Sequence, residues 1–177
     1  FAFAPSTYET VGTYKYTVRE LPGNAGGVTY DNTVYTITVV VTDDGKGNLV
    51  ASVDGADALV FTNTYKAEST EAQLGGSKVL DGRVLLEGEF SFVLKDASGV
   101  ELETVKNTAD GKFVFSPITY TEAGAYTYTI SELPGNAGGV SYDTHVYTVT
   151  VNVTDDANGK LVASVSGSTG IVFRNSY

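Results

Sequence analysis

The stretch AYTYTISE, residues 125–132, shows the pattern that decides the fold. Its side chains alternate with a period of two, which is typical of a β-strand with one buried face. The alternation places Tyr126, Tyr128 and Ile130 on one face, and it places Glu132 on that same face. A carboxylate therefore continues an otherwise apolar surface.

The chain contains the same pattern a second time. Shifting the sequence by 112 residues aligns Phe1 with Phe113 and Glu20 with Glu132, and the run ELPGNAGGV begins at both glutamates. Two segments of 65 residues then align without a gap, with about 40 identical positions, which is the signature of a tandem array. The intervening segment occurs once. We therefore expect an incomplete repeat at 1–66, lacking its first strands, and a complete repeat at 67–177.

Composition limits the classes of partner. The chain of 177 residues is 42% hydrophobic and 18% charged, which is in the globular range, and its net charge of -10 repels nucleic acid and anionic membranes. There is no cysteine, so disulfides are excluded. No apolar run approaches the roughly 20 residues of a membrane span, so no membrane insertion is expected.

Metal and cofactor chemistry is not expected either. His145 is the only histidine and aligns with Thr33 in the other copy, which indicates a surface residue. The loop at residues 42–48 has two adjacent aspartates but lacks the spaced acidic ligands of a calcium loop. We expect no metal and no cofactor.

Strand signals fill the complete copy, with short turns rich in Gly, Asp and Asn between them. Their number and spacing predict an all-β protein with an immunoglobulin-like antiparallel β-sandwich. Strands are expected at 76–80, 89–95, 100–106, 112–116, 125–132, 145–154, 160–165 and 170–175.

Two further strands place a polar side chain on an apolar face. Lys78 alternates in register with Leu74 and Leu80, and Asn175 lies on the same face as Phe173. Tyr177 and Ile171 are expected on that face too. Buried polar groups are unfavourable without partners, so a lysine, a glutamate and an asparagine on inward faces are expected to meet. From alternation alone, the alternative is that each lies at a sheet edge, with the lysine amine reaching water.

The sequences around these three residues resemble the intramolecular isopeptide-bond domains of Gram-positive pilin backbones and surface adhesins. The resemblance rests on SKVLDGRVLLEGEFSFVL with Lys78, on YTYTISE with Glu132 followed by GVSYD and VYTVTVNV, and on IVFRNSY with Asn175. The chain is similar to the streptococcal pilin isopeptide-linkage repeat, a Cna-B-like sandwich. The similarity covers residues 70–177, and residues 1–65 resemble the later part of another such repeat.

The resemblance implies a role for each residue. Lys78 of the first strand would be joined to Asn175 of the last, with Glu132 as the catalyst. Burial disfavours both charged forms, so a neutral amine would face a protonated acid that donates a hydrogen bond to the asparagine carbonyl and moves protons as ammonia leaves. This reaction happens once per molecule, so the chain is not expected to be a turnover enzyme.

The incomplete copy has the matching Glu20 and Asn63 but no lysine at the reactive position. The other lysines near this copy are misplaced for the reaction: Lys15, Lys46 and Lys66. We expect no internal bond in this copy. Two alternatives stay open: Lys78 folds back to bond with Asn63, or the missing strands come from another polypeptide.

The function implied is that of a stalk or pilus-shaft repeat. Such a repeat belongs to a larger extracellular protein on the cell surface or attached to the cell wall. Its expected partners are neighbouring repeats of the same chain and other pilus or surface subunits. The alternative function is a ligand-binding adhesin domain, in which outward rows of threonine and tyrosine would bind a glycan or a host protein.

Overall fold

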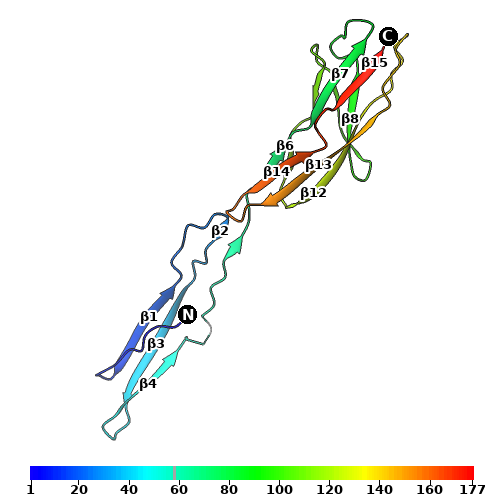
Figure 1. Ribbon diagram of the computed structural model, residues 1–177. Coiled ribbons are helices and arrows are strands. Elements are labelled where there is room, and N and C mark those ends of the chain that lie inside the picture. The colour runs from blue at the N-terminus through cyan, green and yellow to red at the C-terminus, as the bar shows by residue number, and fades with distance from the viewer. Residues whose placement is uncertain (58) are drawn as a thin grey trace. The chain divides into compact units, whose positions relative to one another are not determined.

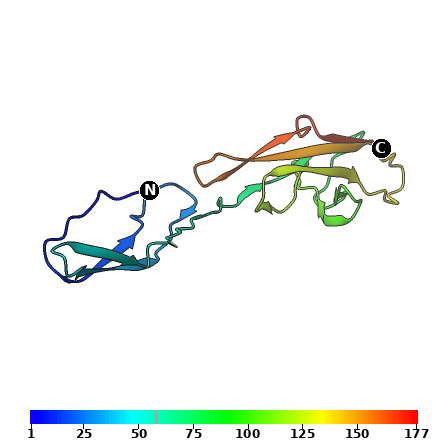
Figure 2. The same cartoon turned by 90° about the horizontal axis from the view of Figure 1, so that it is seen from below.

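The computed structural model describes residues 1–57 and 59–177, and contacts within the chain divide it into two compact units, Phe1–Tyr65 and Lys66–Tyr177. We call them unit 1 and unit 2. Both consist of strands and loops, with no helix among the described residues (Figures 1 and 2). The prediction of an all-β chain is confirmed.

Unit 2 is a sandwich of two main sheets. One sheet has five antiparallel strands in the order β14-β13-β12-β8-β9, and the other has three in the order β10-β7-β15. A small ladder joins β6 and β11. The strand bounds are β6 Thr70–Ala72, β7 Gly75–Asp81, β8 Ser91–Asp96, β9 Glu101–Lys106, β10 Lys112–Val114, β11 Ile118–Tyr120, β12 Gly124–Glu132, β13 Val146–Asp155, β14 Leu161–Ser166 and β15 Val172–Ser176.

All eight expected strands are present, with ends that differ by at most two residues. The short strands β6 and β11 were not predicted, because three residues are too few to show alternation. One pair departs from the antiparallel pattern, since β7 and β15 run parallel, side by side (Figure 1). The first long strand of the unit therefore lies next to its last.

Aromatic rings fill the space between the sheets of unit 2. The rings of Phe92 and Phe113 are stacked with centroids 3.9 Å apart, and Phe173 packs against both. All three are fully buried. Tyr177 was expected on this face, but it is 61% exposed, because β15 ends at Ser176 and its ring lies beside the Arg83 guanidinium instead.

Unit 1 has the later strands of the same pattern. Its main sheet has the order β1-β3-β4, and β2 pairs with β5. The bounds are β1 Gly12–Arg19, β2 Val28–Thr29, β3 Val34–Asp43, β4 Leu49–Asp54 and β5 Thr64–Tyr65. Phe1 and Phe3 are 81% and 68% exposed, whereas the aligned Phe113 and Phe115 of unit 2 are 1% exposed. The apolar face of unit 1 therefore lacks the covering that β7 to β10 give to unit 2.

The aromatic core makes a prediction about stability. Phe92→Ala should lower the free energy of unfolding of unit 2 by about 3–5 kcal/mol, because it removes a fully buried ring and leaves a cavity. Hydrogen exchange of the β12 amides in the whole chain measures this. Val84→Ala is the control, since Val84 is 79% exposed and its truncation should change stability by less than about 0.5 kcal/mol. Equal effects of the two substitutions would contradict the assignment of the core.

Candidate functional site

Three polar side chains meet inside the core of unit 2. Lys78 of β7 donates a hydrogen bond from Nζ to Glu132 Oε2 over 2.8 Å, and Asn175 of β15 donates from Nδ2 to Glu132 Oε1, also over 2.8 Å. The side chains of Lys78 and Glu132 are fully buried, and Asn175 is 1% exposed. The carboxylate therefore bridges an amine and an amide away from water.

Strand pairing brings the three residues together. In the parallel ladder, Lys78 lies opposite Phe173, so that Asn175, two residues further along β15, is on the same face as Lys78. Glu132 is the last residue of β12 in the other sheet and lies opposite Phe92. The structure buries all three residues, although β15 is the edge strand of its sheet and Glu132 ends β12, and the amine of Lys78 does not reach water as the alternative required.

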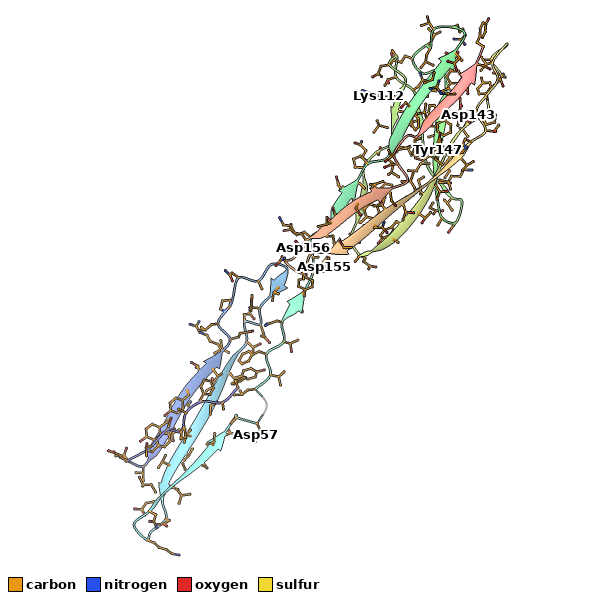
Figure 3. The ribbon with its side chains drawn as sticks, in the orientation of Figure 1. Asp57, Lys112, Asp143, Tyr147, Asp155 and Asp156 are labelled. Carbon is orange, nitrogen blue, oxygen red and sulfur yellow. The ribbon has the colours of Figure 1, made fainter. Side chains whose placement is uncertain are left out.

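The amide of Asn175 has a definite orientation. Its Oδ1 accepts a hydrogen bond from the backbone N–H of Asp143 over 2.7 Å. A backbone N–H can only donate, so the atom that faces it must be the oxygen, and the nitrogen must face Glu132. Figure 3 shows Asp143 near β15. This differs from the expected arrangement, in which the glutamate donates to the asparagine carbonyl.

The amine of Lys78 is in an environment that disfavours its charge. Burial lowers the pKa of Lys78, although the hydrogen bond and the charge of Glu132 act in the opposite direction. The ring of Phe90 lies 4.6 Å from Nζ, measured to the ring centroid, and Phe90 is itself fully buried. The contacts of Nζ that the structure describes are the Glu132 carboxylate and the Phe90 ring, and it is the burial of the amine that favours its neutral form.

A buried asparagine that the sequence did not indicate supports this environment. Asn107 is 2% exposed and accepts a hydrogen bond from the Phe90 N–H over 2.8 Å. Its amide nitrogen donates to the carbonyls of Leu86 and Thr108. Asn107 therefore fixes the segment that holds the Phe90 ring over Lys78. Alternation could not find it, because it lies just after the end of β9.

The loop ELPGNAGGV has a packing role beside the site. The hydroxyl of Tyr142 accepts a hydrogen bond from the Ala137 N–H over 3.2 Å, and its ring packs edge-to-face on Phe90. A Cβ atom on Gly135 would collide with that hydroxyl, and Gly139 has φ 80°, which favours glycine. The glycines thus let the loop close tightly over Tyr142.

Unit 1 contains the same arrangement without the amine. Asn63 donates from Nδ2 to Glu20 Oε1 over 2.8 Å, and its Oδ1 accepts from the Asp31 N–H over 2.8 Å. Glu20 Oε2, the counterpart of the atom that binds Lys78, is buried and has no partner among the described residues. Since Lys78 contacts Glu132 in unit 2, the alternative in which it folds back to Asn63 is not the arrangement of this structure.

The remaining candidate positions lie at the surface. His145 is exposed, and its ring is 4.4 Å from that of Tyr147 (Figure 3 labels Tyr147). In the loop at 42–48, Asp44 accepts hydrogen bonds from the backbone N–H groups of Lys46 and Asn48, so it stabilises its own turn. Across residues 1–57 and 59–177, no group of three or more His, Cys, Asp or Glu side chains could hold a metal ion. Within those residues no helix has the length and apolar character to cross a membrane.

Comparison with protein families gives a match over nearly the whole chain. The FctA family model, described as a Spy0128-like isopeptide containing domain, matches residues 1–66 and 74–177. The chain belongs to this family. Members of the family are structural proteins, in agreement with the prediction that this chain is not a turnover enzyme. A comparison with curated proteins found no match.

Solved structures similar to this chain are major pilins of Streptococcus pyogenes. The T-13 pilin has 18% identity and a TM-score of 0.27, with 97% of this chain and 67% of the pilin covered. The T3.2 pilin has 18% identity and a TM-score of 0.26, with 94% and 66% covered. A mutant major pilin has 18% identity and a TM-score of 0.29, with 96% and 70% covered. At these TM-scores the superpositions carry no argument, and the assignment rests on the family model.

The burial of Lys78 predicts a lowered pKa for its amine. In the Asn175→Ala variant, which keeps the amine and Glu132 but has no amide to react with, the pKa of Lys78 should lie below that of lysine in a model peptide, because burial disfavours the ammonium form. The ¹³Cε chemical shift of Lys78, followed against pH, measures it. A pKa at or above the model-peptide value would contradict this account of the site.

Proposed function

We propose that residues 67–177 form an isopeptide-linked repeat of a stalk or pilus shaft, in which Lys78 Nζ is joined to Asn175 Cγ with Glu132 as the catalyst. The observation that carries the proposal is the buried contact of one carboxylate with both the amine and the amide, each over 2.8 Å. A carboxylate in this position can pass a proton from the amine nitrogen to the amide nitrogen. The membership of the chain in an isopeptide-containing family supports the same chemistry.

The proposed reaction is an exchange of one amide for another. The ammonium of Lys78 first gives a proton to Glu132, and the neutral Nζ attacks Asn175 Cγ to form a C–N bond. Glu132 then returns a proton to Nδ2, which leaves as ammonia when the old C–N bond breaks. The second proton lost by Nζ goes to Glu132, which ends as the neutral acid. The net change is an ammonium, a carboxylate and a primary amide to a secondary amide, a carboxylic acid and ammonia, with no cofactor or metal.

The parallel pairing of β7 and β15 explains why such a bond suits a load-bearing repeat. Because the two strands run in the same direction, the start of β7 and the end of β15 lie at opposite ends of the ladder (Figure 1). Tension applied to the chain on either side of unit 2 therefore shears β7 against β15. A covalent tie between Lys78 and Asn175 carries this load directly, and the strands between them stay folded.

Membership of the isopeptide-containing family supports a proposal about where such a repeat acts. We propose that the chain is part of a larger extracellular protein, on the cell surface or attached to the cell wall. Its partners would be neighbouring repeats of the same chain and other pilus or surface subunits.

Intact mass tests the bond. The wild-type chain should be lighter than its sequence by one ammonia, because only unit 2 has all three residues. The variants Lys78→Ala, Glu132→Gln and Asn175→Ala should each have the full mass of their sequences. Fragment spectra should then place the cross-link between the peptides that contain Lys78 and Asn175.

Asn63→Ala is the matched control, because it removes the aligned asparagine in unit 1, whose described partners Glu20 and Asp31 belong to unit 1 as well. It should still lose one ammonia. A wild-type mass equal to that of the sequence would overturn the proposed bond. A cross-link that depends on Asn63 would overturn the assignment of its residues.

We further propose that residues 1–66 form an incomplete repeat that accepts a lysine-bearing strand. The observation in favour is that Glu20 Oε2 is buried without a hydrogen-bond partner among residues 1–57 and 59–177, while Asn63 is held as Asn175 is. In unit 2 the same position binds the amine of Lys78. The occupant that fits is therefore a segment of the β7 to β10 kind, with a lysine that reaches Glu20 and apolar side chains that cover Phe1 and Phe3.

A separate polypeptide of residues 67–112 tests this second proposal, because it supplies the strands that unit 1 lacks. Mixed with the whole chain, it should form a covalent adduct whose mass is the sum of the two less one further ammonia, joined through Asn63. The same segment with Lys78→Arg should give no adduct, and neither should a chain with Asn63→Ala. An adduct that survives Asn63→Ala, or no adduct with the unaltered segment at millimolar concentration, would contradict it. Neither result affects the mass test of unit 2.

A further inference from the structure

We infer that the backbone N–H of Asp143 is the group that stabilises the oxyanion when the isopeptide bond forms. The inference rests on the proposed function and adds a catalytic group to it. In the structure, Glu132 faces the nitrogen of the Asn175 amide, so it is not placed to polarise the carbonyl. The described hydrogen-bond donor to Oδ1 is the N–H of Asp143, at 2.7 Å.

The distance from the Asp143 nitrogen to Oδ1 and the burial of the amide suit the stabilisation of an oxyanion. Attack on Cγ turns the carbonyl into a tetrahedral centre with negative charge on Oδ1. Donors that stabilise such charge lie about 2.7–3.1 Å from the oxygen, and they act most strongly where water is excluded. Asn175 is 1% exposed, so the N–H acts in a medium of low dielectric constant.

The N–H is held in position before any reaction. The carboxylate of Asp143 accepts one hydrogen bond from the backbone N–H of His145 over 2.9 Å and another from that of Arg174 over 2.8 Å. Arg174 is the neighbour of Asn175 in β15. The side chain of Asp143 therefore ties its own backbone to the strand that carries the reacting amide.

A second tie lies on the other side of the site. Ser141 and Ser176 exchange backbone hydrogen bonds of 2.8 and 3.2 Å, so the segment before Asp143 runs alongside the end of β15. Hydrogen bonds to Arg174 and to Ser176, the two neighbours of Asn175, therefore fix the N–H donor relative to the amide. Such preorganisation means that little reorganisation is needed as charge develops on the oxygen.

Unit 1 shows that this arrangement does not depend on the lysine. There the Asp31 N–H donates to Asn63 Oδ1 over 2.8 Å, and the Asp31 carboxylate accepts from the backbone N–H groups of Thr33 and Thr62. No lysine contacts Glu20 among the described residues. The asparagine carbonyl thus accepts a hydrogen bond from the equivalent backbone N–H in both units, with or without an amine beside the glutamate.

Proton transfer and stabilisation of the oxyanion are therefore divided between the two ends of one loop. Glu132, at the start of ELPGNAGGV, accepts from the amine and the amide nitrogen and transfers protons between them. Asp143, three residues after that run, holds the oxygen. When the tetrahedral centre collapses, the C–Nδ2 bond breaks, ammonia leaves, and the new amide oxygen accepts from the same N–H.

Replacing the amide between residues 142 and 143 by an ester tests the inference. The hydroxy-acid analogue of aspartate, introduced at position 143 of the whole chain during cell-free translation, keeps the side chain and removes only the N–H. Aliquots quenched in denaturant over time give the rate of ammonia loss by intact mass. We expect the rate to fall by about 10²–10³-fold, as for loss of one oxyanion donor.

The matched control is the same ester at position 31. It removes the equivalent N–H from unit 1, where the described acceptor is Asn63 Oδ1, and should leave the rate unchanged. If wild-type and position-143 ester chains react at the same rate, the inference is overturned while the proposed function stands. If the wild type itself loses no ammonia, the proposed function fails instead.

A second measurement does not depend on folding of the ester chain. In the cross-linked wild type, labelled with ¹⁵N and ¹³C, a scalar coupling should cross the hydrogen bond from the Asp143 nitrogen to the isopeptide carbonyl carbon. The Asp143 amide proton should also exchange slowly with solvent. A fast-exchanging proton without this coupling would overturn the inference.

Discussion

The structure of unit 2 depends on keeping the amine of Lys78 inside an aromatic core. Desolvation of an ammonium ion is unfavourable by several kcal/mol, and removing one partner of a buried pair is destabilising by about 3–5 kcal/mol. Glu132 is therefore required wherever this lysine is buried, and the amide of Asn175 satisfies the other oxygen of the carboxylate. To bring these groups together, the last strand must run parallel to the first long strand, and β12 must end directly beneath the ladder that they form.

The same constraint gives the proposed reaction a physical reason. A buried ion pair is a weak source of stability, because the attraction of the two charges only partly compensates for their lost hydration. Conversion of the amine and the amide into a secondary amide leaves a neutral group in the core and releases ammonia to water. The proposed bond would also close a loop of about 100 residues, for which the chain-entropy model of cross-links gives on the order of 4.7 kcal/mol. Burial thus makes the unreacted state costly and the reacted state stable.

The sequence could predict on which face of a strand a side chain lies, but not which strands are neighbours in the fold. Period-two alternation placed Lys78, Glu132 and Asn175 on inward faces, because side-chain direction in a strand is a local property. It could not distinguish a sheet edge from a core, since that depends on the long-range pairing of β7 with β15. Tyr177 was misplaced because alternation does not show where a sheet ends. Asn107 and Asp143 gave no signal, since each acts on or through backbone groups that only the folded chain brings near.

Comparison of the two units shows which features of the site are present without the amine. By the acceptor we mean the asparagine amide with the glutamate and the backbone N–H that hold it. Unit 1 has the loop, the glutamate, the asparagine and the backbone N–H, and it arranges them as unit 2 does although no described lysine contacts Glu20. The acceptor geometry therefore does not depend on a lysine beside the glutamate. This explains why ELPGNAGGV is identical in the two copies while many strand positions differ. Strand positions that face solvent tolerate change, whereas the loop sets the distance between a carboxylate at one end and an N–H just beyond the other. A change in its length or in the glycines that close it over the tyrosine would separate the two groups that hold one amide.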